Sequence, residues 1–174
     1  MPGGVPPYWA MQESLVSALR ARRPAVHKHW EALLRAEPVS TPLGHPDALV
    51  HLIDWTLDEI FSALGDPLAQ HREGENRSNA GRTPVCPCGR NPLLRYFAAG
   101  EQSMHEALVL AQAASAPLDP RERDSSFEEL NGVLQRISRR EIEAFCGVCQ
   151  YREEARRCAV PTWGNFSSAL SITA

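Results

Sequence analysis

The chain has 174 residues, of which 43% are hydrophobic and 22% are charged. A chain of this length and composition is expected to form one globular domain whose core needs no disulfide bonds. The net charge of −3 gives no electrostatic footprint for nucleic acid or for an anionic membrane surface. No apolar run approaches the ~20 residues of a membrane span, and the N-terminal residues lack the pattern of a signal peptide. We therefore expect a cytoplasmic protein, with neither nucleic acid nor membrane as a partner.

Apolar residues recur at helical spacing in the first third of the chain. Residues 8–22 are expected to form one helix, and a second is expected to begin at Pro24, because proline suits a first helical turn, and to end before Pro38. A third, clearer stripe follows at i, i+3, i+4 spacing. Its members are Leu49, Leu52, Ile53, Leu57, Ile60, Phe61 and Leu64.

Residues 65–91 differ from the segments on either side. Glycine, asparagine, arginine and proline dominate, and apolar side chains are almost missing. A connection this long is usually functional or mobile, and we expect 68–84 to be the most mobile internal segment. The segment carries Cys86 and Cys88 near its end.

Two long helices are predicted in the second half. One spans 92–114, with Phe97, Met104 and Leu108 on its buried side. Ser126 followed by Glu129 has the pattern of a capping box, which predicts that the last helix begins at 127. Its core stripe is formed by Phe127, Leu130, Leu134, Ile137, Phe145 and Val148. The prediction is an all-α single domain over 1–174, a bundle of about five helices with a long internal loop and a four-cysteine site at one end.

Four of the five cysteines fall into two close pairs, Cys86 with Cys88 and Cys146 with Cys149. A C-x-C or C-x-x-C pair lets two sulfurs converge on one ion. If the two long helices form an antiparallel hairpin, residues at equal distances from its loop face each other. Residue 92 lies 22 positions before 114, and Cys149 lies 22 positions after 127. The two pairs are therefore predicted to meet and to supply four thiolates.

Zinc is the expected metal, because closed four-thiolate sites are most often zinc sites. An iron–sulfur cluster uses the same ligands, and a thiol redox switch based on Cys146 and Cys149 is a further alternative. A closed site has no open position for a substrate, which disfavours an enzyme. Arg90, Arg95 and the N-terminus of the 92–114 helix are expected to offset the thiolate charge. Cys158 is read as a spare thiol.

The remaining candidates are weaker. His105 lies too far along its helix to join the cysteines, and His27 and His29 read as solvated residues. The tail 158–174 has no charged side chain but contains Trp163 and Phe166. We expect it to cover an apolar groove of its own chain or of a second copy, since an exposed apolar segment favours aggregation. A homodimer or a protein partner follows from this expectation.

The first half, with Trp30, Leu33, Leu34 and Pro38 followed by Leu49, Leu52, Ile53 and Leu57, resembles the N-terminal sensor domains of the RsbT co-antagonist (stressosome) family. The resemblance covers about half of the chain and rests on helical apolar spacing. It implies a helical, globin-related domain that dimerises and regulates partners. Together with the cysteines, it suggests a metal-binding sensor, regulatory or protein-interaction domain of a bacterium.

Overall fold

Helices form every described element of the computed structural model, which describes residues 11, 13–36, 44–65, 86, 90–115 and 118–148. In chain order they are α1 (Glu13–Ala21), α2 (Arg23–Ala36), α3 (Pro46–Leu49), the 3-10 turn η2 (Val50–Leu52), α4 (Ile53–Gly65), α6 (Pro92–Ala114) and α7 (Pro120–Val148). The all-α prediction is confirmed for this part of the chain. None of these helices is both long and apolar enough to cross a membrane.

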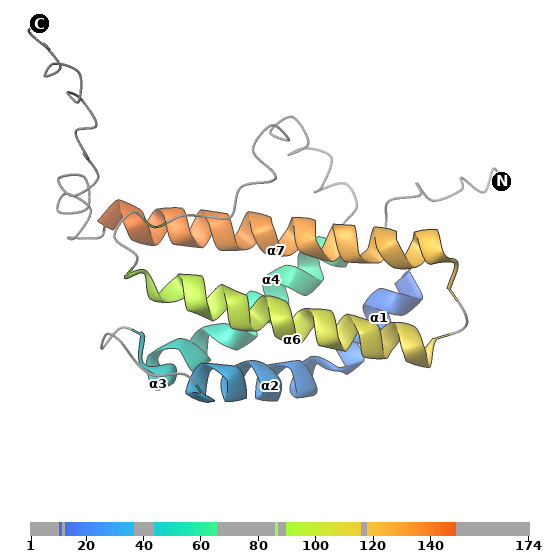
Figure 1. Ribbon diagram of the computed structural model, residues 1–174, viewed down its shortest axis with the longest axis horizontal. Helices are drawn as coiled ribbons and strands as arrows, with labels where there is room; N and C mark the ends of the chain where they lie inside the picture. The colour runs from blue at the N-terminus through green and yellow to red at the C-terminus, as the bar shows by residue number, and fades with distance from the viewer. Residues whose placement is uncertain are drawn as a thin grey trace, which may run out of the picture.

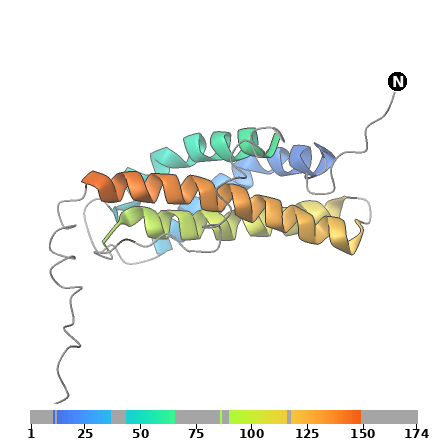
Figure 2. The same cartoon turned by 90° about the horizontal axis from the view of Figure 1, so that it is seen from above.

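The two longest described helices, α6 and α7, form an antiparallel pair that runs along the length of the molecule (Figure 1). The shorter helices pack against this pair: α2 contacts α6, α4 contacts α7, and α1 contacts both α6 and α4. Figure 2 shows α4 and α1 following one another along one flank of the pair. The hydrophobic core fills the space between these layers.

The predicted apolar stripe of 49–64 is buried except at one position. The buried members are Leu49, Ile53, Leu57, Ile60, Phe61 and Leu64. Leu52 is 39% exposed because it belongs to η2, whose 3-10 turn has three residues per turn and therefore shifts the helical face. Pro46 begins α3 at a position where its missing N–H costs no hydrogen bond.

Trp30 of α2 lies at the centre of the core and is fully buried. Its indole Nε1 donates a hydrogen bond of 2.9 Å to the backbone carbonyl of Tyr96 in α6. The ring can approach the α6 backbone because residue 100 is glycine: a Cβ there would lie within 3.0 Å of three atoms of the Trp30 ring. Gly100 is therefore required by close packing between α2 and α6.

The start of α7 corrects one prediction. The helix begins at Pro120 rather than at 127, and Ser126 lies inside it, where its hydroxyl donates to the carbonyl of Glu122. The capping box is formed instead by Asp119 and Glu122. The Asp119 carboxylate accepts from the Arg121 amide at 2.8 Å, and the Asp119 amide donates to the Glu122 carboxylate at 3.2 Å. The Ser126 pattern was misleading because an equivalent pattern lies seven residues before it.

Candidate functional site

The side chain of Asn91 links the N-terminus of α6 to the last turns of α7. Its amide Nδ2 lies 3.2 Å from the backbone carbonyl of Ile142 and 3.3 Å from the sulfur of Cys146. Asn91 is 4% exposed; its contact with Ile142 is buried, and its contact with Cys146 is partly buried. The cysteine-bearing end of α7 is thereby joined to the beginning of α6, as an antiparallel hairpin requires.

Asn91 occupies its position because it is the N-cap of α6. Its backbone is extended, its Oδ1 accepts the Leu93 amide at 2.9 Å, and Pro92 follows in the first turn. With the oxygen used as a cap, both hydrogens of the amide nitrogen remain for α7. One asparagine thus caps α6 and provides the donor that contacts the Cys146 sulfur.

Two of the predicted ligand cysteines, Cys86 and Cys146, lie within the described residues. Cys86 is buried at 6% exposure, and Cys146 is half-buried against the hydrophobic core. The other two predicted ligands, Cys88 and Cys149, lie outside the described residues, as does Cys158. Within the described ranges, no group of three metal-ligating side chains comes together. The predictions for 68–84 and 158–174 also fall outside these ranges.

The helix register differs from the one predicted by counting. Because α7 begins at Pro120, the residue 22 positions after its start is Ile142, and Asn91 at the start of α6 contacts Ile142 and Cys146. Cys146 is the described cysteine that contacts the N-cap residue of α6. Val148 lies beyond this contact and is 84% exposed, so its predicted place in the core is wrong, whereas Ile142 is buried.

The start of α6 brings positive charge to this end of the hairpin. The N-terminal end of α6 carries a positive partial charge, which favours negative charge on the nearby Cys146 sulfur. The same positive end lies near the negative C-terminal end of α7, and the two attract. Arg95 contacts α2 near the same end of α6. Its guanidinium donates to the Leu34 carbonyl in the last turn of α2, where a positive charge stabilises the negative helix end.

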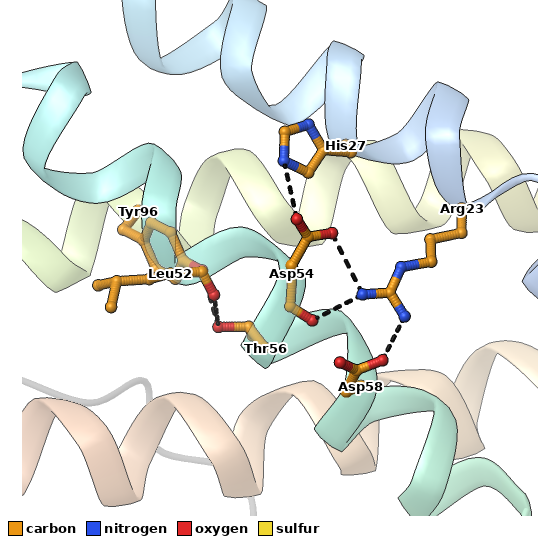
Figure 3. A network of polar contacts seen from close by, with 7 residues as sticks. All are labelled: Arg23, His27, Leu52, Asp54, Thr56, Asp58 and Tyr96. Atoms are coloured by element: carbon orange, nitrogen blue, oxygen red, sulfur yellow. Dashed lines mark hydrogen bonds and ion pairs between the residues drawn. The ribbon is translucent and has the colours of Figure 1, made fainter.

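A second polar cluster joins α2 to α4 on the surface (Figure 3). The Arg23 guanidinium contacts the carboxylates of Asp54, at 3.1 Å, and Asp58, and His27 Nε2 lies 3.7 Å from Asp54. The hydrogen bond from Arg23 lowers the pKa of Asp58. The two aspartates are about two-thirds exposed, so their ion pairs are screened and stabilise the fold only slightly. We interpret this cluster as a structural contact that links α2 to α4.

Two further histidines, His29 and His105, take part in contacts between helices. His29 Nδ1 lies 3.2 Å from the carboxylate of Glu106, which links α2 to α6. His105 contacts the Asn131 side chain at 2.5 Å and so links α6 to α7.

Asn91 is the site residue that sequence reasoning missed. Its signal was present, because an asparagine followed directly by a proline at the start of an apolar-periodic segment is a helix-start pattern. That pattern predicts the N-cap. It does not predict the contact with Cys146, which depends on the packing of α6 against α7.

Comparison of the chain with protein-family models, with curated proteins and with solved structures finds no match. The function has to be argued from the residues of the chain itself.

Proposed function

We propose that this protein is a helical sensor or protein-interaction domain in which Cys86, Cys88, Cys146 and Cys149 bind one metal ion, zinc being the expected metal. The observation that carries the proposal is the meeting of the α6 N-terminus with Cys146, through the 3.3 Å contact from Asn91. This contact brings the chain segment that follows Cys86 and Cys88 next to the α7 turn that holds Cys146.

Chain length supports a shared site. Cys86 precedes Asn91 by five residues, which keeps their Cα atoms within about 18 Å, and Cys88 is nearer along the chain. Cys149 directly follows Val148, the last residue of α7. Both pairs are therefore tethered to the same end of the α6–α7 hairpin. Four thiolates at this end would complete a tetrahedral zinc site.

The electrostatic environment also supports thiolate ligands. Four thiolates around a zinc ion carry a formal charge near −2, which is costly to bury without nearby positive partial charges. The N-terminus of α6 supplies such a charge, and the Asn91 amide donates directly to the Cys146 sulfur. Hydrogen bonds of this kind orient and stabilise sulfur ligands in metal sites.

The sensor or interaction role follows from the kind of site and from the resemblance of the first half to stressosome sensor domains. A closed four-thiolate site leaves no coordination position for a substrate, so we propose a structural or sensory metal rather than a catalytic one. A homodimer is the proposed assembly, in which the uncharged 158–174 segment covers an apolar surface.

Metal analysis and an absorption spectrum of freshly purified protein test the proposal. One zinc per chain with no visible absorption is the expected result. Iron together with sulfide-type visible absorption would instead identify an iron–sulfur cluster on the same ligands. Cys158→Ser is the matched control, since it removes a cysteine outside the proposed site and should retain the metal, whereas Cys149→Ser should lose it. Metal-free protein with titratable thiols would overturn the metal site and favour the redox switch of Cys146 and Cys149.

A further inference from the structure

Asn91 uses all of its polar groups within a small volume at the end of the hairpin. The Oδ1 atom caps α6 by accepting from Leu93, and the Nδ2 atom contacts both Ile142 and Cys146. An amide nitrogen has two hydrogens, so each contact can receive its own donor. The side chain is 4% exposed, and its contact with Ile142 is buried.

We propose that Asn91 is a positioning residue of the metal site, which holds the Cys146 sulfur in its metal-binding orientation and offsets its negative charge. This inference rests on the proposed function. It goes further by naming a residue outside the ligand set that sets the metal affinity of the site.

Two physical effects support this role. An N–H group that points at a sulfur stabilises the thiolate state that a metal needs, and it restricts the side-chain rotation of the cysteine. The contact with the Ile142 carbonyl fixes the amide itself, because Ile142 and Cys146 are one helical turn apart on the same face of α7. Asn91 is in turn fixed by its role as the cap of α6. The donor is thus held rigidly from both helices.

The substitution Asn91→Asp separates this role from capping. Aspartate caps a helix as well as asparagine does, so the contact with the Leu93 amide can be retained. It has no N–H donor, however, and it places a carboxylate against the Ile142 carbonyl and the Cys146 sulfur. Asn91→Ser also keeps a capping oxygen and removes the amide donors, but it adds no charge.

Cobalt(II) titration of the metal-free full-length chain is the test, because cobalt bound to thiolates gives a sulfur-to-metal charge-transfer band. We expect wild type to bind one equivalent, Asn91→Ser to bind more weakly, and Asn91→Asp to bind about 10- to 100-fold more weakly, with a shifted charge-transfer band. Asp119→Asn is the matched control. It makes the reverse exchange at the N-cap of α7, at the opposite end of the hairpin, and should leave affinity and spectrum unchanged.

The outcomes are distinct. If wild type binds no cobalt at the cysteines, the proposed function fails and this inference fails with it. If wild type binds cobalt and both Asn91 variants are folded and bind it with wild-type affinity and an unshifted band, only the role of Asn91 is overturned. An equal loss of affinity in Asp119→Asn would also overturn it, because capping and not donation to sulfur would then account for the effect.

Discussion

Replacing Gly100 by alanine tests the close packing of α2 on α6. The added Cβ would lie within 3.0 Å of three atoms of the Trp30 ring, a separation that real Cβ atoms essentially never show. The ring cannot move away without cost, since Trp30 is fully buried and its Nε1 donates to the Tyr96 carbonyl at 2.9 Å. The substitution therefore sets helix propensity against packing.

The magnitudes favour packing. Alanine stabilises a helix interior by about 1 kcal/mol relative to glycine. Overpacking of a core costs about 1–3 kcal/mol, and loss of the buried indole hydrogen bond adds on the order of 1 kcal/mol. We expect Gly100→Ala to lower the free energy of unfolding by on the order of 2 kcal/mol despite its better helix propensity.

Urea unfolding followed by circular dichroism measures this difference, with Gly132→Ala as the matched control. Gly132 lies in α7, and a Cβ there would meet only the end of the flexible Arg136 side chain, at 3.4 Å. That variant should be stabilised by up to about 1 kcal/mol. Trp30→Phe removes the clashing part of the ring. The double variant Gly100→Ala with Trp30→Phe should therefore lose less free energy of unfolding than the sum of the losses of the two single variants. Stabilisation by Gly100→Ala, equal to that of Gly132→Ala, would refute the packing argument.

Three further variants test individual hydrogen bonds. The Thr56 hydroxyl donates to a backbone carbonyl, so the Tyr96 hydroxyl donates to Thr56, and Tyr96→Phe should cost about 1 kcal/mol at neutral pH. Burial raises the pKa of Tyr96, so the protonated phenol stabilises the fold fully below about pH 10, and this stabilisation is lost as the pH rises above that value. Chemical unfolding at several pH values should therefore show that the difference in free energy of unfolding between wild type and Tyr96→Phe narrows above about pH 10. A constant difference up to about pH 11 would contradict this. Asp119→Ala removes the cap of α7 and should lower the free energy of unfolding by about 1 kcal/mol. Ser126→Ala acts inside the helix and should lower it by less than half of that amount. Equal losses of stability in thermal unfolding would contradict the assignment of Asp119 as the cap.

The sequence predicted the helices well where apolar periodicity was long and the ends were marked by proline. The 92–114 helix has the predicted bounds, because Pro92 can begin a helix and Pro117 follows its end. The start of α7 was misplaced because two capping patterns compete there. Periodicity alone cannot choose between Asp119 and Ser126, since the choice depends on which hydrogen bonds the folded chain makes.

The candidate site was predicted only in outline. The hairpin principle correctly brought the start of α6 to the end of α7, but the error in the α7 start displaced the counted partner of Pro92 from Ile142 to Cys149. Neither Asn91 as sulfur donor nor the contact of Arg95 with α2 could be derived from spacing. Both depend on how neighbouring helices are rotated about their axes, which tertiary packing decides.

The central claim is that the cysteines at the end of the α6–α7 hairpin form one metal site. It is tested most directly by a double-mutant cycle of Cys86→Ser and Cys146→Ser, with metal content and thermal unfolding measured for each variant. The account predicts that either substitution releases the metal and lowers the unfolding temperature, and that the double variant is little worse than either single one, because ligands of one site act as a unit. Full metal retention in either single variant, or losses of stability that add strictly, would contradict it.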